Sequence, residues 1–357
     1  MRPVLIPVER TGWQQVLIRL AAVLLALVLA ALLLAATGKN PGEVLFAMLD
    51  GAFGSKYGMQ ESLVRAIPLL LCGLGVALAA RMRLWNIGAE GQFYLGAVAA
   101  TGVALKAGYM PAVLLLPLML IAGAAAGGLW AAFAGWMKTA LKMNETISTL
   151  LLNYVAINWV TYLVYGPWKD PKGSNFPLSP ILSKAAWLPA VWGRAHVGFF
   201  VALAAALLLW WALRATRWGY QVRVIGESPA AAAYAGMSSG RQILLVLFIS
   251  GALAGLAGMM EVSGVVHRLQ TSLSPGYGYT AIILAWVAKL SPLALVPVAL
   301  LFGGLQNGGY SVQTLGVPLA TVGMIQGLLL FTVLGTELLT THRLQFVVRP
   351  PRAKEVA

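Results

Sequence analysis

The residues best placed to do chemistry in this chain lie in a short polar segment, residues 81–92, between two apolar runs. This segment holds one carboxylate, two carboxamides and two glycines: Glu90, Asn86, Gln92, Gly88 and Gly91. A charge at the centre of a membrane-spanning helix costs about 2.5–3.5 kcal/mol on an insertion scale, and irregular backbone at that depth survives only where protein or water covers it. The polar segment is therefore either a structural break or part of a transport apparatus.

Glu90 admits two functions that the sequence leaves open. It could act as a gate or pathway element, or it could be a structural carboxylate that accepts hydrogen bonds from the backbone at a broken helix. In the structural case, Arg81 or Arg83 could pair with it. A helix that begins at Leu84 would place Glu90 about 9 Å along its axis. We prefer the structural interpretation.

Carboxamides recur in or beside the apolar runs, at Asn86, Gln92, Asn153, Asn158 and Asn307. Amides offer both donors and acceptors, which suits them to binding a polar solute. They also join helix to helix, for about 0.6 kcal/mol on average. Asn153 and Asn158 are five residues apart, which is roughly 140° around a helix, so at most one of the two would line a given path.

A cationic segment at residues 214–241 contains a short sequence with complete helix signals. Ser228 suits the N-cap, Pro229 the first helical position and Gly236 the position after the end, and the alanines between them favour helix. The helix predicted at 228–236 is too short to span a bilayer. These signals fit an interhelix turn as well as a surface on which a partner docks.

The chain that must position these residues has the composition of a multi-pass membrane protein. Its 357 residues are 59% hydrophobic and 10% charged, whereas soluble domains are about 25% charged. The apolar runs predict an all-α fold of about ten transmembrane helices, some of them discontinuous or re-entrant. The predicted spans lie near 15–36, 65–80, 84–105, 112–137, 146–165, 197–214, 241–262, 276–290, 293–308 and 318–336.

The positions of the charges orient this arrangement. With the N-terminus inside, sixteen of the 25 Lys and Arg residues fall on inside segments, so the positive-inside rule accounts for the net charge of +14 without nucleic acid. The prediction is a cytoplasmic segment 1–14, a transmembrane domain 15–340 and a basic cytoplasmic tail 341–357. The loop 166–196 is external, and the cationic segment is cytoplasmic. Tryptophans in the external loop suit the membrane interface or a docking surface for an external partner.

Several kinds of chemistry are excluded by residue type. Cys72 is the single cysteine, and the three histidines (His196, His267 and His342) lack metal-ligand spacing. The chain has no phosphate-binding loop, because Gly38-Lys39 lacks the upstream glycine and the following hydroxyl residue. It is therefore not expected to hydrolyse ATP, and energy for transport would come from a partner or an ion gradient.

Two segments resemble the permease subunits of ATP-binding-cassette importers, in the simple sugar and nucleoside branch of the branched-chain amino acid and ribose-type permeases. The resemblance covers roughly residues 15–340, and its combination of motifs is similar to that of the nucleoside-type members. It is carried by Asn86-Ile87-Gly88-Ala89-Glu90-Gly91-Gln92, Asn144-Glu145-Thr146-Ile147-Ser148-Thr149-Leu150-Leu151-Leu152-Asn153-Tyr154, Gly166-Pro167-Trp168-Lys169-Asp170-Pro171, the block 219–236 and the glycine run 251–258.

The resemblance implies a permease without catalytic or metal-binding residues, in the bacterial cytoplasmic membrane with both termini cytoplasmic. It would pair with a second, different permease chain, with a cytoplasmic ATPase that carries ATP and Mg, and with an external substrate-binding lipoprotein. The helix at 228–236 would be the coupling helix that docks on the ATPase. The residues assigned to coupling are Glu227, Ser228, Pro229, Ala231, Ala232 and Gly236, and the path candidates for a nucleoside or simple sugar are Asn86, Glu90, Gln92, Asn153, Asn158 and Asn307.

An ion-coupled secondary transporter of a small polar solute is the alternative. Such a transporter needs a relay of carboxylates at membrane depth. Only Glu90 lies firmly within a predicted span, and the helix at 228–236 would have no purpose in it. The importer is therefore the preferred interpretation.

Overall fold

The computed structural model describes residues 2–7, 12–173 and 176–347. These residues form two compact units, one comprising Met1–Ala47 and Gly309–Ala357 and the other Met48–Gly308. The predicted N-terminal segment 1–14 and basic tail 341–357 fall partly on residues 1, 8–11 and 348–357, which lie outside the described residues. The orientation inferred from their charges therefore stays a prediction.

The unit that contains both chain ends is built on a pair of helices. Helix α1 (Gly12–Ala36) packs along α13 (Leu319–Thr341). Strand β1 (Arg2–Pro7) pairs antiparallel with β4 (His342–Val347), an addition to the fold that the sequence did not predict. The Lys39 ammonium donates to the Leu315 carbonyl at 2.7 Å, which joins the segment after α1 to the segment before α13.

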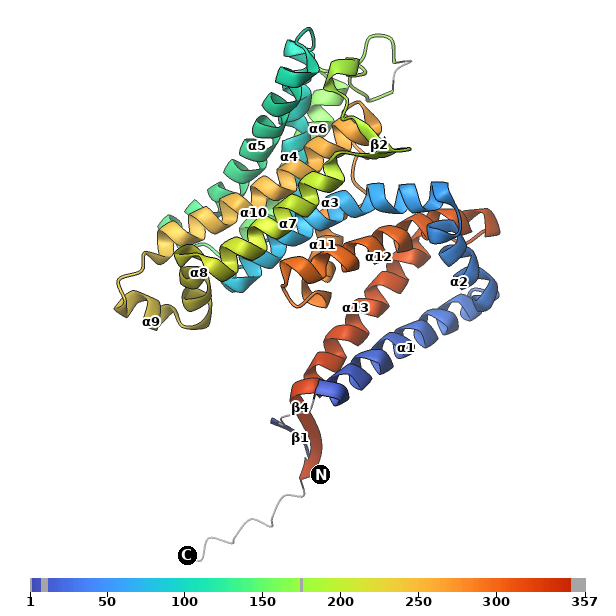
Figure 1. Cartoon of the computed structure of the whole chain (residues 1–357), viewed down its shortest axis with the longest axis vertical. Helices are drawn as coiled ribbons and strands as arrows, with labels where there is room; N and C mark the ends of the chain where they lie inside the picture. The colour runs from blue at the N-terminus through green and yellow to red at the C-terminus, as the bar shows by residue number, and fades with distance from the viewer. Residues whose placement is uncertain (1, 8–11, 174–175, 348–357) are drawn as a thin grey trace, which may run out of the picture. The chain divides into compact units, whose positions relative to one another are not determined.

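The larger unit is a helical bundle with small insertions between its helices (Figure 1). Its long helices are α3 (Lys56–Arg81), α4 (Ala89–Ala107), α5 (Ala112–Leu141), α6 (Glu145–Tyr165), α7 (Gly198–Ala215), α10 (Ser239–Glu261) and α12 (Pro292–Ser311). The shorter elements are α2 (Pro41–Leu49), which leads into the unit, η1 (Asp50–Gly54), η2 (Lys184–Ala186), α8 (Arg217–Glu227), α9 (Pro229–Tyr234), η3 (Val262–Val266), α11 (Tyr277–Val287) and a hairpin of β2 (Ala190–Trp192) and β3 (Ala195–His196). A short η4 (Val312–Leu315) continues α12.

Glycines set the closest packing in this bundle, where α10 lies against α4 and α5. A Cβ atom at Gly96 would overlap the backbone of Gly255, and one at Gly127 would overlap the backbone of Gly251. Small residues four apart let membrane helices approach at backbone distance, and van der Waals contact then replaces the hydrophobic effect as the source of attraction. The glycine run 251–258 is thus the packing face of α10.

The ten predicted spans each coincide with a helix, although their boundaries differ. Within the part of the chain that the structure describes, six helices are long and apolar enough to cross a membrane, and a seventh crossing arises if the bent pair Leu24–Ala36 and Pro41–Gly54 counts as one. The number ten therefore stays a prediction. The span predicted from 84 begins at Ala89, and the span predicted from 65 begins at Lys56, where the Ser55 hydroxyl accepts from Gly58 N–H at 2.9 Å.

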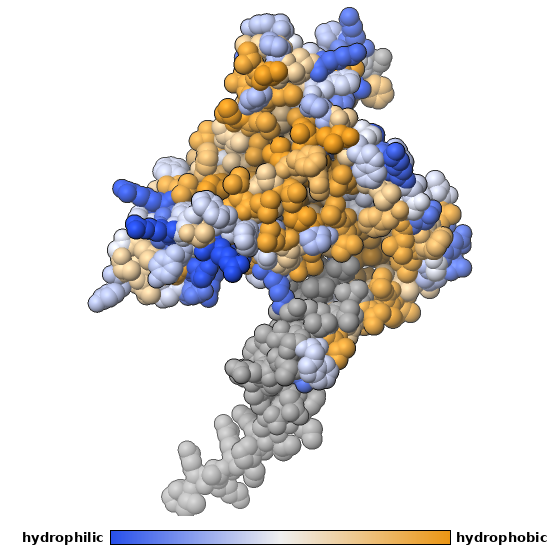
Figure 2. Space-filling view, in the orientation of Figure 1, coloured by the Kyte–Doolittle hydropathy of each residue, from blue (hydrophilic) through white to orange (hydrophobic). Residues whose placement is uncertain are grey.

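The surface of the helical unit divides by polarity. Figure 2 shows apolar side chains spread over the helices and hydrophilic side chains at the connecting segments, among them the region around α8 and α9. Exposed apolar residues on α7, such as Phe200, Leu208 and Trp211, contribute to the apolar face. This pattern is expected of a protein whose helices lie in lipid and whose connecting segments reach water.

Candidate functional site

The polar segment forms a non-helical connection between α3 and α4. Side chains in and around it accept hydrogen bonds from backbone N–H groups that have no helical acceptor. Arg83 adopts a left-handed backbone with φ 56°, and the Asn86 side-chain carbonyl accepts from Gly88 N–H at 3.0 Å. Gly88 then caps α4. These local bonds end one helix and start the next, so the prediction that a helix runs on from Leu84 is wrong.

Asn86 and Gln92 form a reciprocal amide pair. Asn86 Nδ2 donates to Gln92 Oε1 at 2.9 Å, and Gln92 Nε2 donates to Asn86 Oδ1 at 2.8 Å. Asn86 Nδ2 also donates to the Ser250 hydroxyl at 2.8 Å, and that hydroxyl donates to the Gly75 carbonyl. Both amides are buried. Their bonding groups thus join α3, α4 and α10 to one another.

Asn153 ties α6 to the same connection. Its side-chain carbonyl accepts from Gly91 N–H at 2.8 Å, and its Nδ2 donates to the Ile87 carbonyl at 2.9 Å and to the Tyr279 hydroxyl at 3.3 Å. The residue is fully buried. The first turn of α4 therefore takes one of its hydrogen-bond acceptors from α6, because the N–H groups at a helix start lack partners within the helix.

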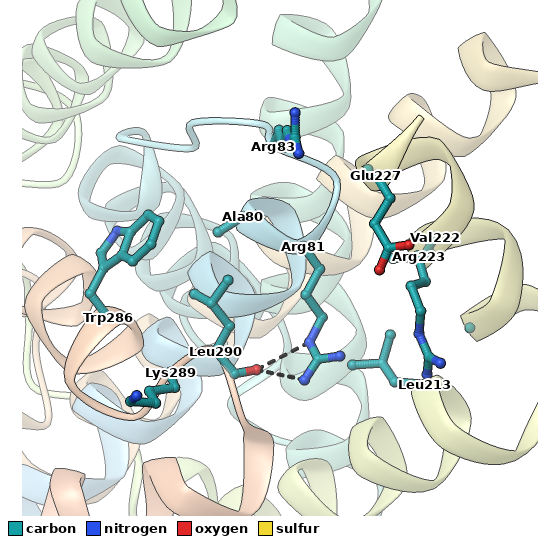
Figure 3. Close-up of a pocket in the computed structure, with 12 residues that line it drawn as sticks. Ala80, Arg81, Arg83, Leu213, Val222, Arg223, Glu227, Trp286, Lys289 and Leu290 are labelled. Atoms are coloured by element: carbon teal, nitrogen blue, oxygen red, sulfur yellow. Dashed lines mark hydrogen bonds between the residues drawn. The ribbon is translucent and has the colours of Figure 1, made fainter. Parts of the chain in front are cut away.

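Glu90 lies at the second position of α4, so its predicted place about 9 Å along a helix is wrong. Its carboxylate is buried and accepts from Gly278 N–H, near the start of α11, at 2.7 Å. Arg81, one of the two cations suggested as its partner, instead donates from Nε and Nη2 to the Leu290 carbonyl at 3.1 and 3.0 Å (Figure 3). Glu90 thus joins the start of α4 to the start of α11.

The two remaining path candidates lie in contrasting environments. Asn307 on α12 is buried, and its Nδ2 donates to the Gly51 and Gly58 carbonyls at 3.1 and 3.0 Å. Asn158 on α6 is exposed, and its Nδ2 donates to the Tyr154 carbonyl one turn earlier in the same helix. Of the six path candidates, Asn158 alone is classed as exposed among the described residues.

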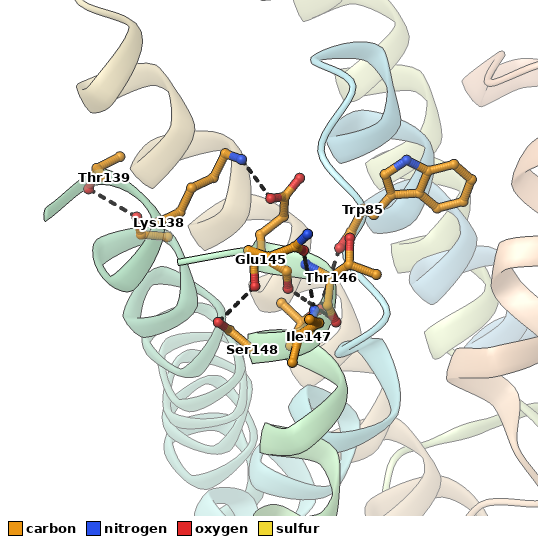
Figure 4. A network of polar contacts seen from close by, with 10 residues as sticks. Trp85, Lys138, Thr139, Glu145, Thr146, Ile147 and Ser148 are labelled. Atoms are coloured by element: carbon orange, nitrogen blue, oxygen red, sulfur yellow. Dashed lines mark hydrogen bonds and ion pairs between the residues drawn. The ribbon is translucent and has the colours of Figure 1, made fainter. Parts of the chain in front are cut away.

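The start of α6 is capped by a side chain and carries an ion pair. Asn144 Oδ1 accepts from Thr146 N–H at 2.8 Å and from Ile147 N–H at 3.4 Å. The Glu145 carboxylate pairs with the Lys138 ammonium at 2.6 Å, which Figure 4 shows bridging the ends of α5 and α6. A carboxylate in the first turn also complements the helix dipole. Asn144 and Glu145 therefore set the α5–α6 turn.

The predicted coupling residues form a short helix in the cationic segment. Glu227 ends α8, the Ser228 hydroxyl accepts from Ala231 N–H at 3.3 Å, and Pro229 begins α9. Gly236, two residues after the helix ends at Tyr234, takes a left-handed backbone with φ 72°. Ala232 faces inward and is buried, whereas Ala231 is exposed and the Tyr234 side chain is 97% exposed. The helix therefore presents an open face.

Helix α8 was missed, although its sequence contains a signal for it. The Thr216 hydroxyl accepts from Gly219 N–H at 3.2 Å, so Thr216 is an N-cap. A Cβ atom at Gly226 would overlap the Arg81 carbonyl, so this glycine lets α8 lie against the end of α3. The polar and apolar residues of α8 segregate on two faces, as in a helix that lies along a surface.

The predicted external loop contains a buried histidine, His196, and a tryptophan that stacks on a histidine outside the loop. Trp187 stacks on His267 with ring centroids 3.8 Å apart, and His196 Nδ1 accepts from Gly198 N–H at 3.2 Å. Burial and, to a smaller extent, the nearby His267 ring lower the pKa of His196 to about 4. Arg194 in the hairpin pairs with Glu61 of α3 at 2.9 Å. These contacts fix the loop to the bundle.

Comparison with known proteins identifies the family. The model of the family described as "Branched-chain amino acid transport system / permease component" matches residues 58–334. The chain is 38% identical over 334 residues to a glucose ABC transporter permease protein of Haloferax volcanii, which spans 90% of this chain and 87% of that protein.

Two further relatives are similar over most of their length. A guanosine ABC transporter permease protein of Bacillus subtilis is 33% identical over 322 residues, covering 89% of this chain and 92% of that protein. A nucleoside ABC transporter permease protein of Lactococcus lactis is 27% identical over 330 residues, covering 90% and 91%. The chain therefore belongs to the branched-chain amino acid transport system permease family, as a multi-pass membrane permease subunit that is not itself an enzyme.

Proposed function

We propose that this permease forms half of the pathway of an ATP-driven importer for a nucleoside, with a simple sugar as the alternative substrate. ABC transporter permeases work with ATPase and substrate-binding partners. The second half of the pathway is a different permease chain, and an external lipoprotein delivers the substrate. The protein lies in the bacterial cytoplasmic membrane with both termini in the cytoplasm. The relatives named for guanosine and nucleosides support the substrate class.

The observation that carries this proposal is a row of exposed aromatic and amide side chains along one face of α6, which we call the α6 stripe. Tyr154, Asn158 and Tyr162 are four residues apart, so they share one face of the helix, and all three are exposed. An aromatic ring can stack on a nucleobase, and an amide can match its donors and acceptors. We assign this stripe to the cavity between the two permeases.

The five other path candidates are assigned to positioning. Asn86, Glu90, Gln92, Asn153 and Asn307 are buried, and their polar side-chain groups bond to neighbouring parts of the chain. A substrate would have to displace these bonds before it could use the same atoms. This assignment leaves Asn158 as the amide with access to a solute.

Reconstitution tests the substrate path. The permease pair, the ATPase and the binding protein are placed in liposomes, and uptake of labelled guanosine, uridine and glucose is measured. Asn158→Ala should lower nucleoside uptake about tenfold, as expected for one lost hydrogen bond to the solute. Leu208→Ala, an exposed apolar position on α7, should leave uptake unchanged. Equal effects of the two variants would contradict the assignment of the stripe.

The same liposomes separate the importer from the ion-coupled alternative. Uptake should require ATP on the side of the liposome membrane where the ATPase is bound. It should not respond to an imposed proton or sodium gradient. Uptake that follows the ion gradient without ATP would favour a secondary transporter. Thermal shifts of the isolated binding protein with guanosine, uridine and glucose would decide between nucleoside and sugar.

We further infer that α9 is the coupling helix, with ATP and Mg held by the ATPase and no cofactor held by this chain. Its open face supports this role, since Ala231 is small and exposed and Tyr234 extends into solvent. A small residue lets a partner approach closely, and an exposed tyrosine supplies a large contact area that loses few rotamers on binding. Glu227, Ser228, Pro229, Ala232 and Gly236 set the position and ends of the helix.

Co-purification tests the coupling assignment. Ala231→Arg should abolish recovery of the ATPase with the permease, because a long charged side chain would enter a close contact. Tyr109→Ala serves as the control, since this tyrosine is also highly exposed but lies in the α4–α5 connection. An Ala231→Arg permease that still recovers the ATPase in normal yield would exclude α9 as the docking element.

A further inference from the structure

A cationic pocket lies at the end of α3, beside α7, α8 and the α11–α12 connection. It has two lobes of about 450 and 260 Å³ that share Arg81, Leu213 and Arg223. Among the described residues that line the lobes, five are cationic and one, Glu227, is acidic. The five cations are Arg81, Arg83, Arg214, Arg223 and Lys289.

The pocket has a fixed wall. Lys289 and Leu290 both adopt left-handed backbone, with φ 52° and 57°, which non-glycine residues rarely do. The Arg81 guanidinium bonds to the Leu290 carbonyl through two nitrogens, and Figure 3 shows it lying between Leu290 and Leu213. Leu290 N–H also donates to the Ala285 carbonyl at 2.8 Å. The α11–α12 turn and the end of α3 therefore hold their cations in a defined arrangement.

A tryptophan lines each lobe of the pocket. Trp286 lines the larger lobe and stacks on Trp85 with ring centroids 5.6 Å apart. Trp210 lines the smaller lobe, and the Arg214 guanidinium lies over its ring at 5.6 Å. Tryptophan is enriched where a membrane meets water, at the depth of lipid headgroups. The pocket also lies at the end of α7, a helix that exposes Leu207, Leu208 and Trp211.

Charge, shape and depth together specify a ligand. Guanidinium groups bind phosphate oxygens through paired hydrogen bonds, and several cations around one cavity favour an anion over a zwitterion. The apolar flank of α7 suits acyl chains, and the cations at its end suit a headgroup. We propose that this pocket binds a phosphate-bearing anion, and that its ligand in the membrane is the headgroup of an anionic phospholipid.

The experiment uses the full-length permease in detergent, titrated with short-chain phosphatidylglycerol, short-chain phosphatidylcholine or inorganic phosphate. Binding is measured by native mass spectrometry and by the thermal shift of the protein. The test variant is Arg214→Gln/Arg223→Gln. The control is Arg217→Gln, which removes an exposed cation that lies on α8, as Arg223 does, but outside both lobes. A cation near an anionic lipid surface contributes about fivefold in affinity, so the double variant should bind phosphatidylglycerol about 25-fold more weakly.

Selective binding of phosphatidylglycerol over phosphatidylcholine, lost in the double variant and kept in the control, supports the proposal. Binding of inorganic phosphate at the same residues supports the phosphate pocket but overturns the lipid as its ligand, provided that phosphatidylglycerol does not compete. Equal affinity of all variants overturns both parts. If the double variant does not fold, Lys289→Asn replaces it, because asparagine tolerates a left-handed backbone.

Discussion

The polar segment at 81–92 and the cationic segment at 214–241 both interrupt a series of apolar helices, but they differ in how far their polar side chains are buried. Asn86, Glu90 and Gln92 in the first are buried and bonded within the chain. Arg217 and Arg223 in the second are exposed. A buried polar group without a partner costs about 1–3 kcal/mol, whereas water satisfies an exposed one. Polarity inside the bundle therefore fixes helices in place, and polarity at its end remains available for binding.

The largest difference is expected between two asparagines of α6, Asn153 and Asn158. Asn153→Leu should lower the free energy of unfolding by about 2–5 kcal/mol, because it leaves Gly91 N–H and the Ile87 carbonyl without their partner. Asn158→Leu should change it by less than about 0.5 kcal/mol, since the side chain is exposed. Thermal unfolding of the purified permease measures both. Similar shifts for the two variants would contradict the distinction between buried and exposed amides.

A pH dependence of nearly the same size is expected at His196, a buried polar residue in the hairpin outside the spans. Its pKa is lowered to about 4, so the unfolded chain, with an ordinary pKa near 6.5, binds the proton more tightly. The contribution of neutral His196 to the free energy of unfolding is therefore fully present above about pH 6.5. It is lost as the pH falls toward 4, and the loss is of the order of 3 kcal/mol. The melting temperature of the wild type should follow this curve.

The matched variant for this pH dependence is His196→Asn. The asparagine carbonyl can accept from Gly198 N–H, as Nδ1 of the histidine does, but it does not titrate. The variant should lose most of the slope between pH 6.5 and 4. His267 has a pKa that burial also lowers, and it would leave a smaller residual slope. An unchanged slope in His196→Asn would contradict the assignment of the acid response to this histidine.

Local signals in the sequence were sufficient for parts of this structure. Ser228, Pro229 and Gly236 act within one short helix, so cap and turn preferences predict where it begins and ends. Periodic apolar runs likewise predicted the long helices, because burial against neighbours or lipid requires them.

Partners far apart in the chain could not be predicted in this way. Glu90 bonds to a backbone group 188 residues later, and Asn86 bonds to a hydroxyl 164 residues later. Sequence patterns indicate that a side chain is costly to bury, but they do not identify the group that satisfies it. The break between the spans predicted at 65–80 and 84–105 was expected, but its extension to Gly88 was not. The left-handed backbone of Arg83 within it follows from packing rather than from the preference of arginine.

A smaller effect on stability is expected for substitutions of Glu90, and they distinguish a gating role of this carboxylate from a structural one. Glu90→Gln keeps an acceptor for Gly278 N–H but replaces a charged hydrogen bond with a neutral one, so stability should fall by about 1 kcal/mol. Uptake by the reconstituted transporter should remain within about threefold of wild type. Glu90→Leu should reduce the yield of folded protein. Normal stability with lost uptake in Glu90→Gln would instead identify this carboxylate as a gate.

The smallest effect on global stability is expected at Ser228, although its effect on coupling should be measurable. Ser228→Ala removes the cap of α9 and should cost this helix about 1 kcal/mol, while the melting temperature stays unchanged because most of α9 is exposed. If the ATPase binds the formed helix, its affinity should fall by up to about fivefold. Asn144→Ala removes an equivalent cap from a long, packed helix, so it should lower the melting temperature and spare ATPase affinity. The opposite outcome would mean that α9 is a structural turn and that the cationic end of the bundle, like the polar segment, mainly positions helices.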